Sequence, residues 1–180
     1  MQLLQYATSF LAISQLLFMA LFYLAYYRRQ LLGRLMSFYA FCLIAYIAST
    51  LPEVNNGPRA FEFPLNMLAI TAPALLWIIT RYLFVDEPKI EKPIWAIIVA
   101  YISLRAFGNV TGPYTDLGYW VIYVSTQLVM LSFACHVVYT AVRGRGGDLV
   151  ESRRRFRVPF AITMGSIVAI IVGSGFFSPS

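Results

Sequence analysis

The chain has 180 residues, of which 59% are hydrophobic and 12% are charged, whereas a typical soluble domain has about 25% charged residues. This composition excludes an ordinary soluble domain and predicts an integral membrane protein. The net charge of +6 would indicate an anionic partner for a soluble protein, but in a membrane protein the distribution of charges matters more than their sum.

Six apolar segments follow one another along the chain. They are too long and continuous to be barrel strands, in which apolar and polar side chains alternate, and most approach the roughly 20 residues that a helix needs to cross a bilayer. The predicted fold class is therefore all-α, a single polytopic membrane helical bundle covering residues 1–180. Its six transmembrane helices are expected at about 3–27, 35–51, 65–84, 94–107, 119–142 and 158–177.

Three of these segments have features that affect how they cross the membrane. The first ends at Arg28 and Arg29. The third carries Pro73, which a membrane helix tolerates when its neighbours satisfy the carbonyl that proline leaves unpaired. The fourth is the shortest, because only 12 residues separate Lys92 from Arg105. It spans the bilayer only if both of these side chains extend toward the interfaces.

The basic residues predict the orientation of the bundle. If the N-terminus is outside, only Arg59 and Arg105 of the 14 basic residues lie on the outer side. The inner connections and their flanks then hold Arg28, Arg29, Arg34, Arg81, Lys89, Lys92, Arg143, Arg145, Arg153, Arg154, Arg155 and Arg157. Cytoplasmic connections of membrane proteins carry the excess of Lys and Arg, so we expect an external N-terminus.

The most basic stretch, "DLVESRRRFRVPF" (residues 148–160), comes directly before the sixth predicted span. Its four arginines are Arg153, Arg154, Arg155 and Arg157. We expect them to hold the orientation of the span and to touch anionic headgroups, each contributing roughly 1 kcal/mol. The i, i+4 spacing of Glu151 and Arg155 predicts a short amphipathic helix. Nucleic-acid binding by this chain alone is not expected, because a groove-reading module needs a folded scaffold.

The sequence carries few signs of chemistry. All eight acidic residues are assigned to connections, which leaves a proton- or cation-coupled pump without an obvious relay in the spans. They are Glu53, Glu62, Asp86, Glu87, Glu91, Asp116, Asp148 and Glu151. Gly-rich phosphate loops, HExxH and CxxC motifs are missing, and the single histidine excludes bis-histidine haem ligation within one chain. We therefore predict no catalytic residue, no metal site and no cofactor.

Polar residues inside the spans are the candidates for ligand binding or sensing, namely His136, Gln127 and Asn66. Imidazole titrates near neutral pH, so His136 could sense pH or bind a ligand. The alternative is a neutral histidine that is hydrogen-bonded to a neighbouring helix. Ser166 lies at a similar depth, but a serine–histidine dyad would lack an orienting acid and an obvious oxyanion hole.

The sixth segment, "AITMGSIVAIIVG", carries small residues at every fourth position. They are Ala161, Gly165, Ala169 and Gly173. Small residues at this spacing let two membrane helices approach closely. The stripe therefore predicts helix packing, either within the bundle, in a homodimer or against a further helix.

Three stretches carry a family resemblance: "RRQLLGRL" after the first span, "RYLFVDEP" after the third and "DLVESRRRFRVPF" before the sixth. With them, nearly the whole chain resembles the N-terminal membrane region of bacterial membrane-bound AraC-type transcription regulators. That resemblance implies the bacterial cytoplasmic (inner) membrane, an external N-terminus, seven spans and a cytoplasmic helix-turn-helix domain. The chain departs from this pattern, because it ends at "FFSPS" after six predicted spans, without the seventh span or the helix-turn-helix domain.

These features predict a non-catalytic sensory or anchoring membrane domain. Its expected partners are membrane lipids, a small apolar or amphipathic ligand and a second copy of the chain. A transporter or transport subunit for a neutral solute is the main alternative, because such transport needs no buried carboxylate. A membrane enzyme is the third.

Overall fold

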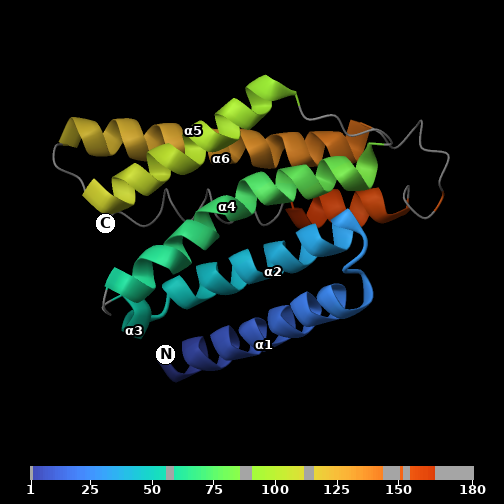
Figure 1. Ribbon diagram of the computed structural model, residues 1–180, viewed down its shortest axis with the longest axis horizontal. Coiled ribbons are helices and arrows are strands. Elements are labelled where there is room, and N and C mark those ends of the chain that lie inside the picture. The colour runs from blue at the N-terminus through green and yellow to red at the C-terminus, as the bar shows by residue number, and fades with distance from the viewer. Residues whose placement is uncertain are drawn as a thin grey trace.

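The regular elements of the computed structural model are helices throughout the part that it describes, residues 2–55, 59–85, 91–111, 116–143, 151 and 155–164. In chain order they are α1 (Gln2–Tyr26), α2 (Leu31–Ser49), α3 (Pro52–Asn55), α4 (Arg59–Phe84), α5 (Lys92–Thr111) and α6 (Asp116–Arg143) (Figure 1). Residues 155–164 are also helical. The predicted all-α fold is therefore confirmed for the described residues.

Four helical segments in the described part of the chain are long and apolar enough to cross a membrane. They are Leu3–Tyr26, Leu31–Ser49, Phe61–Phe84 and Val124–Arg143, which match the first, second, third and fifth predicted spans. The helix α5 covers the fourth predicted span but is not among the four. The predicted sixth span begins within the helix of residues 155–164 and continues outside the described residues, so the number of six remains a prediction.

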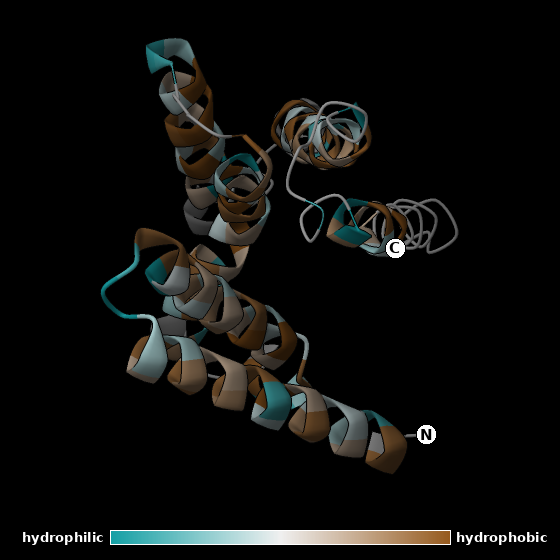
Figure 2. Cartoon of the chain, turned by 90° about the vertical axis from the view of Figure 1, so that its right-hand side faces the viewer, coloured by the Kyte–Doolittle hydropathy of each residue, from teal (hydrophilic) through white to brown (hydrophobic). Residues whose placement is uncertain are grey.

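The helices are apolar on nearly all sides, with hydrophilic residues mostly near their ends (Figure 2). Large hydrophobic side chains on α1 face away from the protein, including Phe18, which is 71% exposed, and Leu21, which is 53% exposed. A contiguous exposed apolar surface of this kind is unfavourable in water. It is favourable in hydrocarbon, where an apolar side chain needs no burial within the protein.

The helix α4 is the centre of the bundle, since it packs against α2, α5 and α6, while α1 packs against α2 (Figure 1). One buried cluster joins α2 to α4 through Cys42, Ala72, Leu75 and Ile79. A second cluster joins α4, α5 and α6 through Ala74, Trp77, Ile98, Tyr101, Phe133 and Val137. The small residues in these clusters allow the helix backbones to approach closely, which is the usual mode of helix packing in membranes.

Neutral hydrogen bonds also connect successive helices. The hydroxyl of Ser37 on α2 donates to the carbonyl of Ala20 on α1, at 3.0 Å, and both residues are buried. The thiol of Cys42 on α2 lies 3.2 Å from the hydroxyl oxygen of Thr71 on α4. Such bonds between membrane helices contribute about 0.6 kcal/mol on average, so they align the helices more than they hold them together.

The two ends of the bundle differ in charge. The α1–α2 turn, the last turns of α4 and α6 and the beginning of α5 lie toward one end, on the right in Figure 1. The exposed basic residues of this end are Arg28, Arg29, Arg34, Lys92, Arg143 and Arg155. The opposite end carries α3, the beginning of α4 and the end of α5. This distribution follows the asymmetry that was read from the sequence.

Candidate functional site

The structure describes six of the residues that were selected from the sequence, namely Asn66, Gln127, His136, Arg155, Arg157 and Ala161. Outside the described residues lie Arg153, Arg154, Gly165, Ala169 and Gly173. The described six do not form one site. Two of them, His136 and Arg157, make contacts between helices that have chemical consequences.

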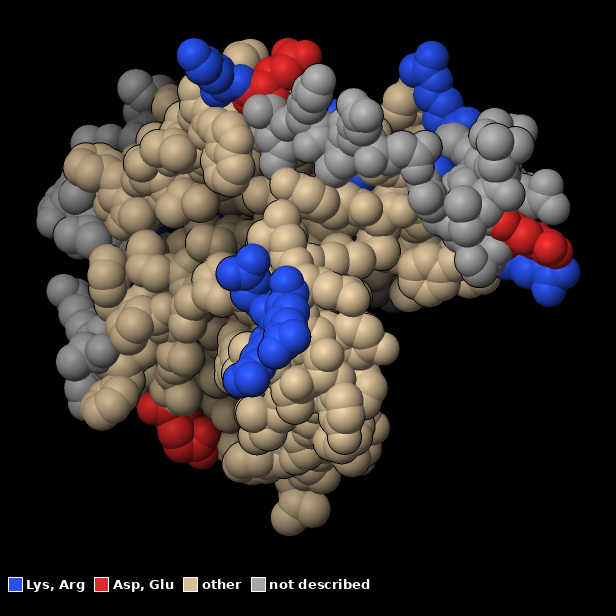
Figure 3. Space-filling view, turned by 45° about the vertical axis from the view of Figure 1, so that its right-hand side comes forward, with Lys and Arg blue, Asp and Glu red and all other residues tan. Residues whose placement is uncertain are grey.

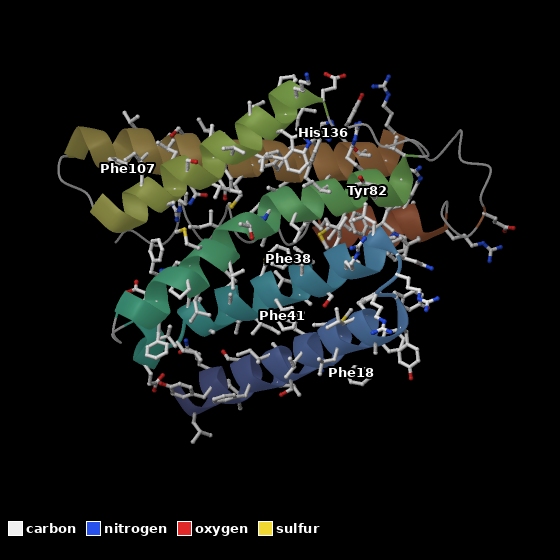
Figure 4. The ribbon with its side chains drawn as sticks, in the orientation of Figure 1. Phe18, Phe38, Phe41, Tyr82, Phe107 and His136 are labelled. Carbon is white, nitrogen blue, oxygen red and sulfur yellow. The ribbon has the colours of Figure 1, made fainter. Side chains whose placement is uncertain are left out.

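His136 on α6, which is labelled in Figure 4, is hydrogen-bonded to Trp77 on α4. The indole Nε1–H of Trp77 donates to Nδ1 of His136 at 3.0 Å, and the indole is only 4% exposed. Indole nitrogen is a donor and never an acceptor, so Nδ1 must be unprotonated. The imidazole is therefore neutral and carries its proton on Nε2. This geometry agrees with a histidine that bonds to a neighbouring helix, which was one of the two interpretations drawn from the sequence.

The other ring nitrogen of His136 remains available to a ligand. His136 is exposed on the outer surface of α6, and no residue in the described ranges accepts a hydrogen bond from its Nε2–H. Thr140 contacts the same ring nitrogen as the indole, since its hydroxyl oxygen lies 3.1 Å from Nδ1. The ring thus presents one hydrogen-bond donor outward and uses its acceptor inside the bundle.

Aromatic rings and cations continue from His136 toward the basic end of the bundle. The ring of Tyr139 lies 6.1 Å from that of His136, and Arg143 both donates to the Tyr139 hydroxyl and stacks over its ring, at 5.4 Å. On α4, the guanidinium of Arg81 lies 5.6 Å from the centre of the Trp77 ring. Cation–π contacts of this type contribute about 0.5–2 kcal/mol each.

Gln127 and Asn66 lie far from this cluster. Gln127 is half-buried on α6 and precedes His136 by nine positions, which is about 14 Å along a helix. Asn66 donates to Glu62 within α4, at 3.4 Å. Because α4 begins earlier than predicted, Glu62 is in its first turn, and the assignment of Glu62 to a connection was wrong. Its carboxylate is placed favourably there, near the positive end of the helix dipole.

Arg157 corrects another expectation. It was predicted to touch lipid headgroups together with its neighbours, but its side chain is only 3% exposed. Its Nη1 donates to the carbonyl of Thr140 at 3.1 Å, and its Nη2 donates to the carbonyl of Phe84 at 2.8 Å. The guanidinium also lies 4.6 Å from the centre of the Phe84 ring. Arg157 therefore satisfies carbonyls in the last turns of α4 and α6, which lack a partner within their own helices.

Arg155 is exposed, in contrast to Arg157 two positions later. Its side chain is 80% exposed and forms an ion pair with Glu151 at the predicted i, i+4 spacing. Ala161, one turn after Arg157, is buried with Phe84 and Ala141 in a third cluster. The first member of the small-residue stripe therefore packs within the bundle.

Trp77, which orients His136, was not among the residues predicted from the sequence. A tryptophan in an apolar segment gives no signal of its hydrogen-bond partner. The burial of Arg157 could have been suspected, because it shares a helix face with Ala161, at i, i+4. Among the residues that the structure describes, no three potential ligand side chains come together to hold a metal ion.

Comparison with known proteins finds no matching protein family, no similar characterised protein and no similar solved structure. The contacts of Trp77, His136 and Arg157 are therefore the observations from which a function is inferred.

Proposed function

We propose that the chain is a non-catalytic sensory or anchoring membrane domain, similar to the membrane region of bacterial membrane-bound AraC-type transcription regulators. The observation that carries this proposal is the pair of contacts made by Thr140. Its hydroxyl oxygen lies 3.1 Å from Nδ1 of His136, and its carbonyl accepts a hydrogen bond from Arg157. One residue of α6 thus connects the outward-facing imidazole to the helix of residues 155–164.

The signal in this proposal is a small apolar or amphipathic ligand with a hydrogen-bond acceptor. Its acceptor would bind the outward Nε2–H of His136, and its apolar part would lie against the adjacent surface of α6, where Tyr139 is 51% exposed and its ring lies 6.1 Å from that of His136. A ligand shifts a conformational equilibrium only by the difference in its affinity for the two states. The difference in affinity arises here because the hydrogen bond from Trp77 to Nδ1 keeps the proton of the ring on Nε2, where it can be donated to the ligand.

The output in this proposal is the position of the helix of residues 155–164. Arg157 binds the carbonyls of Phe84 and Thr140, so a shift of α6 relative to α4 would strain or release both bonds. The beginning of the last predicted span, within that helix, would then move with them. Discrete rearrangements of packed helices by about 1–2 Å are a common form of such switching.

The proposed topology has six spans with the N-terminus outside, in a bacterial inner membrane. Its support is the gathering of exposed basic side chains at one end of the bundle, because cytoplasmic connections carry the excess of Lys and Arg. In this orientation the Arg157 contacts lie near the cytoplasmic surface, where a change could be passed to other proteins.

The test is the variant Trp77→Phe, which removes the indole N–H and keeps an aromatic ring. Loss of one hydrogen bond should lower the free energy of unfolding by about 1 kcal/mol. It should also speed hydrogen–deuterium exchange in residues 155–164, measured by mass spectrometry in detergent. The matched control is Trp95→Phe on α5, since Trp95 is 48% exposed and should leave that exchange unchanged.

Two results would contradict the proposal. Unchanged exchange in residues 155–164 of Trp77→Phe, despite a lower stability, would show that the contact between α4 and α6 is not coupled to that helix. Directional uptake of a neutral solute by proteoliposomes containing the purified chain would favour the transporter alternative instead.

A further inference from the structure

The turn between α1 and α2 presents three arginines that the contacts described so far do not use. Arg28 and Arg29 lie in the turn, and Arg34 lies in the first turn of α2. All three are exposed, and none of their side chains forms a hydrogen bond or an ion pair with a residue that the structure describes. Figure 3, in which this end of the molecule comes forward, shows basic side chains gathered among uncharged residues. The three arginines of the turn therefore differ from Arg155, which has a carboxylate partner, and from Arg157, which is buried.

The turn holds these arginines on a rigid backbone. The amide of Gln30 donates to the carbonyl of Tyr27 at 2.9 Å, and the amide of Arg34 donates to the carbonyl of Gln30 at 3.2 Å. Gly33 is buried against Tyr27 so closely that an added Cβ would lie 2.4 Å from the Tyr27 Cβ. A rigid backbone lowers the entropy lost when a ligand is bound.

A stripe of exposed aromatic side chains on α1 leads directly to this turn. Phe18, Phe22 and Tyr26 follow one another at i, i+4 spacing, and they are 71%, 42% and 75% exposed. Their rings lie 6.4 Å and 5.0 Å apart along the stripe. Phe18 points away from the bundle (Figure 4). Tyrosines next to arginines at a helix end mark the depth of the membrane interface, so the stripe runs from headgroup level into the hydrocarbon.

We propose that Arg28, Arg29 and Arg34 bind the headgroup phosphate of an anionic membrane lipid, with an acyl chain lying along Phe18, Phe22 and Tyr26. The planar guanidinium group binds two phosphate oxygens at once. Three cations lie in this turn and in the first turn of the helix that follows it, with no acidic side chain among residues 27–34, and they complement a phosphate diester that keeps its negative charge. The apolar stripe selects a lipid over a free phosphate ion. This site is independent of the proposed sensory function.

The experiment measures lipid binding to the whole chain in a neutral detergent. Native mass spectrometry compares phosphatidylglycerol with phosphatidylcholine, using wild type and the triple variant Arg28→Gln, Arg29→Gln, Arg34→Gln. Each arginine near an anionic surface contributes about fivefold in affinity. The variant should therefore bind phosphatidylglycerol on the order of a hundredfold more weakly, while its binding of phosphatidylcholine stays unchanged.

The matched control removes the same charge from the same end of the bundle. The triple variant Lys92→Gln, Arg143→Gln, Arg155→Gln lowers the net charge by the same three units and should keep the affinity for phosphatidylglycerol. An equal loss in both variants would overturn the site, because binding would then follow net charge alone. Equal retention of inorganic phosphate and of phosphatidylglycerol by wild type would overturn the assignment to a lipid.

A further variant keeps the test decisive if the neutral one fails to insert. Arg28→Lys, Arg29→Lys, Arg34→Lys keeps the charges that orient the helices but replaces each guanidinium by an ammonium, which cannot bind two oxygens in the same way. It should fold and bind phosphatidylglycerol severalfold more weakly than wild type. Wild-type affinity in this variant would contradict a site built on paired guanidinium contacts.

Discussion

Replacement of Arg157 by methionine tests whether a buried arginine joins the ends of two helices. The change removes two charge-assisted hydrogen bonds, to the carbonyls of Phe84 and Thr140, at 2.8 Å and 3.1 Å. Each such bond stabilises by about 1.5–3 kcal/mol, and the contact with the Phe84 ring adds about 1 kcal/mol. Removing the guanidinium also removes the cost of its desolvation, which offsets part of the sum. The expected loss in the free energy of unfolding is about 2–4 kcal/mol.

The assay is thermal unfolding of the purified chain in detergent. A loss of 1 kcal/mol lowers Tm by about 2–4 °C in a chain of this size, so Arg157→Met should lower Tm by roughly 5–15 °C. The control is Arg155→Met, two positions away. Arg155 is 80% exposed and pairs with Glu151, and an exposed i, i+4 pair contributes about 0.3–0.5 kcal/mol. That variant should change Tm by no more than about 2 °C.

The comparison of the two variants decides the outcome. Similar small shifts for Arg157→Met and Arg155→Met would refute the reasoning, because a bridge between α4 and α6 would then contribute nothing. A higher Tm for Arg157→Met would show that desolvation of the guanidinium outweighs its hydrogen bonds.

Three further predictions follow from single contacts and from the charge distribution. Tyr6 donates to Glu53 at 2.5 Å, and this bond lowers the pKa of the Glu53 carboxyl below its usual 4.5. The contribution of this bond to folding stability is therefore fully present above pH 4.5 and is lost as the pH falls through the lowered pKa of Glu53. The Tm difference between wild type and Tyr6→Phe should accordingly persist at pH 7 and vanish in acid. Gly33→Ala should lower the free energy of unfolding by about 1–3 kcal/mol through overpacking against Tyr27, although alanine is the better helix former; an unchanged Tm would contradict the close approach. A reporter fused after Arg143 should be cytoplasmic, and an external signal would overturn the proposed orientation.

Two arginines show which contacts could be predicted from the sequence and which could not. From the sequence, Arg155 and Arg157 belong to one basic run, and both were expected at the membrane surface. The i, i+4 pairing of Arg155 with Glu151 is local and was predicted. The partner of Arg157 at Phe84 is 73 positions away, and no local pattern indicates it.

The partner of His136, the candidate sensing residue, was likewise not predictable from the sequence. Its place in an apolar segment left two interpretations open, a ligand-binding histidine and a histidine bonded to a neighbouring helix. The indole of Trp77 that decides its tautomer is 59 positions away in sequence. Helix boundaries were also predicted only approximately, because α2 and α4 begin before their most apolar residues, and a charged residue such as Arg34 can occupy the first turn at the interface.

The sequence by itself determined the apolar helical class of this protein and the gathering of its charges at the helix ends. These properties depend on the length of each apolar segment and on neighbouring residues, so they need no knowledge of the packing. Only the tertiary structure decided that α4 is central, that Arg157 is buried and that His136 is neutral with its proton on Nε2. The physical reason is that nearly every side of these helices is apolar, so hydrophobicity does not select the packed face. The close fit of small side chains and a few hydrogen bonds between distant residues select it instead.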